Sequence, residues 1–179
     1  MSLVDMDKYF EDFDQFLIDN PEHRKSYELF QQIADESPRG MVLVIAAELD
    51  RMLLLAIKEL LIDGAGLKAL NQDNQGPMST FSARINLSHA LGIIDDMEYR
   101  DLHLIRKIRN DFAHDASASL EDQSISARIR ELSNAQSTAG PDEVLEQAAV
   151  YLLMHLAGAI DGAKVAQLPV ISRTYGPPV

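Results

Sequence analysis

The sequence contains no cysteine, and it lacks the short motifs that mark the commonest enzyme sites. Without cysteine the chain has no disulfide, no thiolate zinc site and no cysteine nucleophile. No glycine-rich loop resembles those that hold phosphates or dinucleotides, and no Gly-x-Ser-x-Gly turn presents a serine. None of the five histidines pairs with another at the four-residue spacing of a helical zinc site. We therefore expect no metal and no cofactor.

The chain also lacks an excess of basic residues. It has 16 Lys and Arg against 28 Asp and Glu, which gives a net charge of -12. Because affinity for nucleic acids comes largely from cations that displace counterions from phosphates, this balance disfavours direct DNA binding. The junction at 91–95 has the length of a helix-turn-helix turn, but Asp95, Asp96 and Glu98 follow it and would face the phosphates. We expect no sequence-specific DNA reading.

No long uncharged apolar run and no secretory signal is evident. The first dozen residues are acidic, whereas a signal is basic and then apolar. Glu48, Asp50 and Arg51 interrupt the longest apolar stretch, so no segment is expected to span a membrane. These features predict a cytoplasmic protein.

What the sequence does contain is helical periodicity in the spacing of its apolar residues. It predicts seven helices, at about 5–18, 21–36, 41–62, 80–92, 95–113, 120–133 and 141–164. Helix 41–62 is apolar on nearly every side, which is typical of a helix buried on several faces. No stretch alternates apolar and polar residues as a half-buried strand does. We predict an all-α, single-domain antiparallel helical bundle over residues 1–168, with a loose tail at 169–179.

The periodicity also predicts which side chains face the core. The expected inward residues of four helices are Tyr27, Phe30 and Ile33; Phe81, Ile85, Leu87, His89, Ala90 and Leu91; Leu102, Ile105, Ile108 (or Arg109) and Phe112; and Val144, Leu145, Ala148, Tyr151, Leu152, His155, Leu156 and Ile160. Gly92 is expected to end one helix, and Asp95 and Asp96 to cap the next. Helices 41–62 and 143–160 are apolar enough for a homodimer interface, although a well-covered core explains them equally.

One run of residues has the composition of a site: Arg109, Asn110, Asp111, Phe112, Ala113 and His114, at the end of a helix. Arg106, Asn110 and His114 follow one another at four-residue spacing and therefore share one stripe. Arginine donates two hydrogen bonds to a phosphate or carboxylate, and histidine titrates near neutral pH. Asp111 and Asp115 flank His114. The alternative is structural, because cationic side chains near a helix C-terminus also oppose the helix dipole.

Two segments together resemble the mannitol operon repressor family: residues 78–94 (Met-Ser-Thr-Phe-Ser-Ala-Arg-Ile-Asn-Leu-Ser-His-Ala-Leu-Gly-Ile-Ile) and residues 98–114, which end in Arg-Asn-Asp-Phe-Ala-His. The region at 47–57 also fits, and the resemblance covers roughly 40–135. It implies a bacterial, all-helical regulator without a recognised DNA-binding motif, linked by name to repression of mannitol use. Such a regulator is expected to act indirectly, by binding another regulatory protein or a transcription complex.

Arg109 and His114 also resemble the Arg-x4-6-His motif of the HEPN superfamily, which includes metal-independent ribonucleases as well as inactive binding modules. That resemblance implies a phosphate-binding role for Arg109, proton transfer by His114 and an orienting role for Asn110, usually in a site between two protomers. The sequence thus leaves two interpretations. The first is a non-enzymatic regulator that uses Arg106, Arg109, Asn110, Asp111 and His114 for interaction, and the second is a ribonuclease.

Overall fold

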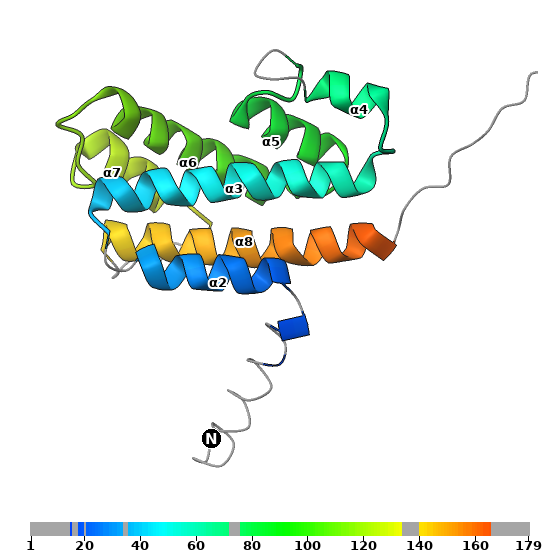
Figure 1. The fold of residues 1–179 in the computed structure, drawn as a ribbon. Coiled ribbons are helices and arrows are strands. Elements are labelled where there is room, and N and C mark those ends of the chain that lie inside the picture. Colours follow the sequence, from blue (N-terminus) through cyan, green and yellow to red (C-terminus); the bar gives the residue numbers. More distant parts are fainter. Residues whose placement is uncertain are drawn as a thin grey trace, which may run out of the picture.

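The computed structural model describes residues 15, 18–19, 21–33, 36–71, 76–133 and 140–165. Over these residues every regular element is a helix and there is no strand. The helices are α2 (Pro21–Ile33), α3 (Pro38–Leu60), α4 (Ala65–Leu70), α5 (Phe81–Ala90), α6 (Asp96–His114), α7 (Gln123–Arg130) and α8 (Pro141–Val165), as drawn in Figure 1. The all-α prediction is confirmed. The helix predicted at 5–18 and the tail predicted at 169–179 lie outside the described residues, apart from positions 15 and 18.

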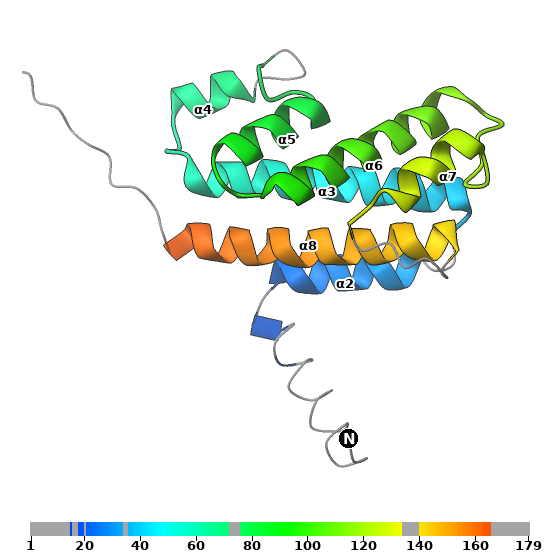
Figure 2. The same cartoon turned by 180° about the vertical axis from the view of Figure 1, so that it is seen from behind.

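Helix α3 is the centre of the bundle, as its sequence predicts. It packs against α8 and α2 on one side and against α5 and α6 on the other, while α7 contacts α6 and α8. Figures 1 and 2 show α3 between these two groups from opposite sides of the molecule. Its buried residues are Met41, Val42, Ile45, Ala46, Leu49, Met52, Leu53, Ala56 and Ile57. A helix covered on two sides needs apolar residues around most of its circumference, which explains the composition.

Local signals set the helix ends. The Ser37 hydroxyl accepts a hydrogen bond from the Gly40 N–H (3.1 Å), and Pro38 occupies the first turn of α3. Thr80 caps α5 in the same way, accepting from Ala83 N–H at 3.1 Å. Gly92 adopts a φ of 72°, the left-handed conformation that glycine reaches without strain, and so turns the chain from α5 into α6. The predicted glycine stop is therefore confirmed.

The C-terminus of α6 is closed by a side chain from a different helix. Arg39, in the first turn of α3, donates to the carbonyls of Phe112, Asp115 (2.8 Å) and Ala116 (2.9 Å). Its guanidinium also lies 5.5 Å from the centroid of the Phe112 ring. The last carbonyls of a helix lack intrahelical donors, so this arginine supplies them and opposes the negative end of the dipole.

Some sequence predictions of burial and length are wrong. Tyr27, Ala90, Leu91, Tyr151 and His155 were expected to face the core, but all five are exposed. Tyr151 lies on a part of α8 that stays exposed, and His155 lies beside it with its Nδ1 2.6 Å from Glu98 of α6; periodicity alone cannot tell how wide the covered face is. Helix α3 ends at Leu60 rather than at 62, and the helix predicted at 120–133 shortens to α7 (Gln123–Arg130).

Helix α8 is long and apolar enough, by length and composition, to cross a membrane over Pro141–Lys164, and the sequence prediction overlooked this segment. Half of that window is buried inside the bundle. Leu145, Leu152, Leu153 and Leu156 are each at most 1% exposed, in contact with the central core. The core helix of a bundle passes the same test of composition, and the packing of α8 against α3 accounts for its apolar character.

Candidate functional site

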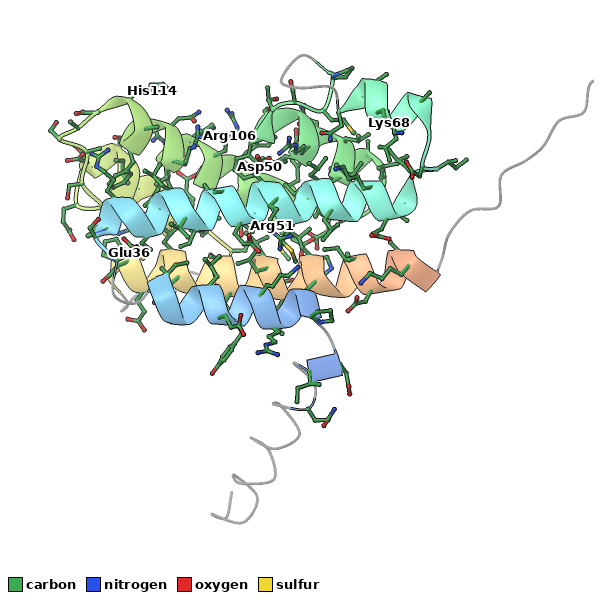
Figure 3. All side chains as sticks on the ribbon, viewed as in Figure 1. Glu36, Asp50, Arg51, Lys68, Arg106 and His114 are labelled. Atoms are coloured by element: carbon green, nitrogen blue, oxygen red, sulfur yellow. The ribbon has the colours of Figure 1, made fainter. Side chains whose placement is uncertain are left out.

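A polar cavity of about 540 Å³ opens between α3, the start of α5 and the second half of α6. Figure 3 shows the Arg106 and Asp50 side chains in this space between α3 and α6. We name it the α3–α5–α6 cavity; its lining residues are Leu43, Ala46, Ala47, Asp50, Ser79, Thr80, Phe81, Ser82, Arg106, Arg109 and Asn110. Three of the five residues predicted from sequence as interaction candidates therefore meet in one hollow.

Two arginines supply the positive charge of the cavity. Arg106 is half-buried, and its Nε atom is inaccessible to solvent and has no hydrogen-bond partner. Arg109 is exposed and donates from Nη1 to Asn110 Oδ1 at 3.1 Å. A buried N–H group without an acceptor costs free energy, because water satisfied it in the unfolded chain. Arg106 is therefore held where folding alone gives it no partner.

Asp50 supplies the opposite charge from α3. Its Oδ2 accepts from Arg84 Nη1 at 2.7 Å, while its Oδ1 is buried without a partner. Burial raises the pKa of the Asp50 carboxyl above its ordinary value, and the positive charges of Arg84 and then Arg109 oppose that rise. Arg84 is fixed in turn by a second bond from Nε to the Met78 carbonyl, at 2.9 Å. The cavity thus contains one unpartnered acceptor and one unpartnered donor.

His114 lies outside this cavity, at the far end of α6 (Figure 3). It is exposed and lines a second, shallower hollow of about 400 Å³, together with Asn110, Asp111, Asp115, Ala118, Asp122, Ser124, Ile125 and Arg128. Asp111 forms an ion pair with Arg128, and Asp115 accepts from the Ser117 N–H (2.8 Å) and hydroxyl (2.7 Å). These bonds lower the pKa of the Asp115 carboxyl. Both acids flanking His114 therefore have other partners.

The structure divides the stripe predicted from sequence. Arg106 and Arg109 line the first cavity, His114 lines the second, and Asn110 touches both. Among the described residues, Arg109 and His114 thus line two different hollows of one chain. Among the described residues no group of three or more His, Asp or Glu side chains is arranged to hold a metal ion.

Sequence reasoning missed Asp50, Arg84, Ser79 and Thr80 as parts of the site. Asp50 was noted only as part of the polar remainder of an apolar helix. A carboxylate in the central helix of a bundle is itself a signal, because its charge is costly there without a partner. Arg84 carries no comparable signal, since nothing in its local sequence indicates that it pairs with a residue 34 positions away.

Over the described residues, the fold and these cavities define an all-helical bundle protein whose candidate sites are hollows along α6. The mannitol repressor family model matches residues 67–157, just over half of the chain, and the chain belongs to this family. The match starts later than the sequence resemblance at 40–135 and continues into α8. No curated protein gave a significant match.

A solved structure shares the fold. A chain from the X-ray structure of the MtlR-HPr complex from Escherichia coli superposes with a TM-score of 0.54 at 20% sequence identity. The match covers 78% of this chain and 98% of that chain. At this identity the likeness establishes a common helical architecture and leaves the details of the surface to each protein.

Proposed function

We propose that this protein is a regulator of the mannitol repressor type that acts by binding a partner protein, and that it works in the cytoplasm. The observation that carries the proposal is its membership of the mannitol repressor family. The fold it shares with a chain of the MtlR-HPr complex makes HPr the first partner to test. We thus propose a regulator that has no enzymatic activity of its own.

The charge distribution supports a protein partner over DNA. The chain carries a net charge of -12, and the helix that follows the 91–95 turn begins with Asp96 and Glu98. The Asp95 side chain accepts from Glu98 N–H (2.9 Å) and Glu98 accepts from Asp95 N–H (2.9 Å), so these acids occupy the first turn as a cap. A helix that began in this way would bring negative charge against the phosphates.

The exposed side of α8 is the surface on which we place the contact with HPr. Val150, Tyr151 and Met154 are 39%, 46% and 38% exposed, and positions 150, 151 and 154 share one side of a helix. The Tyr151 ring stacks on the His155 ring, with centroids 6.5 Å apart. Tyrosine and methionine side chains are enriched at protein interfaces, where they bury large areas. We call these three apolar residues the α8 stripe.

Isothermal titration of the full chain with purified HPr tests the proposal. Tyr151→Ala together with Met154→Ala is expected to weaken binding about ten-fold or more, because each truncation removes a large buried contact. Ile62→Ala, which truncates an exposed apolar residue at the end of α3, is the matched control and should bind as the wild type does.

Absence of binding to HPr would overturn the choice of partner, and equal weakening by Ile62→Ala would overturn the choice of surface. Light scattering of the free protein tests whether a second copy of the chain occupies the α8 stripe. If Tyr151→Ala with Met154→Ala converted a dimer to a monomer, the stripe would be a homodimer interface instead. Tight, salt-sensitive binding of the pure protein to one operator in a gel shift would overturn the indirect route.

A further inference from the structure

We propose that the α3–α5–α6 cavity is a binding site for a small anion that also carries hydroxyl groups, the chemistry of a polyol or sugar phosphate. This inference goes beyond the proposed function, which concerns a protein partner on α8. It assigns a ligand to a hollow on the opposite side of α3, where α5 and α6 pack.

The first argument comes from the two unpartnered atoms. Arg106 Nε is a buried donor and Asp50 Oδ1 is a buried acceptor, and both residues line the same cavity. The great majority of buried polar atoms in folded proteins are hydrogen-bonded, so two exceptions in one hollow require an explanation. Both atoms are closed to solvent in the free protein, so a ligand with an anionic group for the arginine and a hydroxyl for the carboxylate satisfies them when the two side chains turn toward the cavity.

The second argument is the distribution of charge. Arg51, Arg84, Arg100 and Arg128 each form an ion pair with a carboxylate, whereas neither Arg106 nor Arg109 occurs among the ion pairs of the described residues. The chain has 28 acidic side chains, so a shortage of carboxylates is not the reason. Asp50 already has Arg84, so the two remaining arginines leave the cavity with uncompensated positive charge. That charge selects an anion.

The third argument is the shape of the site. A volume of about 540 Å³ lies within the range of roughly 300–1,000 Å³ found for small-molecule sites. Phe81 and Ser82, the first two residues of α5, line it, and the first N–H groups of a helix lack intrahelical acceptors and attract negative charge. Ser79 and Thr80, which precede α5, line the cavity as well, and the Thr80 hydroxyl also caps the helix.

Isothermal titration with four probes tests the site: inorganic phosphate, mannitol 1-phosphate, free mannitol and chloride at matched ionic strength. Mannitol 1-phosphate carries both of the required groups, so it should bind saturably and about ten-fold more tightly than inorganic phosphate. Free mannitol lacks the anionic group, and chloride lacks the hydroxyl groups. Both should therefore bind far more weakly.

Variants then locate the binding. Arg106→Gln with Arg109→Gln should weaken binding of mannitol 1-phosphate about ten-fold or more, and Asp50→Asn should reduce its advantage over inorganic phosphate. Lys107→Gln is the matched control, because it removes one positive charge from the same helix at an exposed position that does not line the cavity. Circular dichroism checks that each variant keeps its helical fold.

Three results would overturn the inference: no saturable binding of either phosphate probe, equal loss of affinity in Lys107→Gln, or free mannitol binding as tightly as its phosphate. Titration of the same variants with HPr keeps the two proposals apart. If the Arg106 and Arg109 variants bound HPr normally but lost mannitol 1-phosphate, both proposals would stand. If the α8 stripe variants lost HPr binding but kept mannitol 1-phosphate binding, the result would bear on the HPr surface and not on the cavity.

Discussion

The two halves of α6 differ in how their buried charged side chains are paired. In the first half, Glu98 is 2% exposed and Asp101 is 4% exposed, and each accepts at least one hydrogen bond: Glu98 Oε2 accepts from the nearby Asp95 N–H, and Asp101 accepts from beyond α7. Asp101 Oδ2 accepts from Ser133 N–H at 2.9 Å, and its Oδ1 lies 3.3 Å from Arg100 Nη2. Glu98 Oε1 lies 2.6 Å from His155 Nδ1 on α8, which is within ion-pair distance when the imidazole is protonated, although the atoms are not aligned as a hydrogen bond.

In the second half, Arg106 has a buried Nε without a partner and faces a cavity. The same helix therefore has polar groups beside its buried acids where it joins α7 and α8, and has none for Arg106 Nε where it meets α3 and α5. A complete network stabilises the fold, whereas an open one costs stability and is retained where a ligand completes it. Removing charges from the two halves should accordingly change stability in opposite directions.

The largest effect is expected in the first half. Asp101→Ala removes the acceptor for Ser133 N–H and the partner of Arg100, so it should lower the free energy of unfolding by about 3 kcal/mol. Urea unfolding measures the change. Asp96→Ala is the control, because that carboxylate is 96% exposed and its pairing with His89 should contribute less than about 1 kcal/mol. Equal losses in the two variants would refute the claim that the buried Asp101 contributes more to stability than the exposed Asp96.

A smaller effect of opposite sign is expected in the second half. Arg106→Met keeps most of the side-chain volume and removes the unpartnered Nε, so it should raise the free energy of unfolding by about 1 kcal/mol. Arg84→Met should instead lower it by about 2 kcal/mol, since it leaves Asp50 without its ion pair. Were Arg106→Met as destabilising as Arg84→Met, Arg106 would be a structural residue and the comparison would fail.

The pH dependence of stability should show the state of Asp50. Because burial raises its pKa above 3.8, the folded protein holds this proton more tightly than the unfolded chain does. The stabilisation from protonated Asp50 is therefore present at low pH and is lost as the pH rises through the window above 3.8. Lowering the pH from neutral toward 3.8 should favour the wild type over Asp50→Asn in urea unfolding. A constant difference between the two would contradict the raised pKa.

The smallest effect is expected at His114. Because His114 and Arg109 line different cavities, RNA incubated with the protein in EDTA should stay intact, and His114→Ala should behave as the wild type does. Gel electrophoresis of labelled RNA measures this. Cleavage by the wild type but not by His114→Ala would support the ribonuclease interpretation, with Arg109 and His114 meeting between two protomers.

Much of the fold could be predicted from the sequence, because the decisive signals are local. Ser37, Thr80 and Gly92 set helix ends within a few residues of themselves, and apolar spacing identified α3 as the central helix. The prediction failed at Tyr151, whose exposure depends on which helices cover α8.

The candidate site was predictable only in part, for the same physical reason. Arg106, Arg109 and Asn110 lie on one helix, so their spacing in the sequence predicts that they lie close together. Asp50 and the start of α5 join them only through the packing of α3 against α5 and α6. The separation of His114 from Arg109 likewise depends on tertiary structure, because the cavities are bounded by other helices.

Arg39 ties together two segments that lie far apart along the chain. Its bonds to the carbonyls at 112, 115 and 116 span separations of 73 to 77 residues. We therefore expect the last turn of α6 and the first turn of α3 to open together, so that amide hydrogen exchange at the end of α6 would report on the start of α3. His114 belongs to the wall of the second cavity. The order of that wall therefore depends on the order of the beginning of α3.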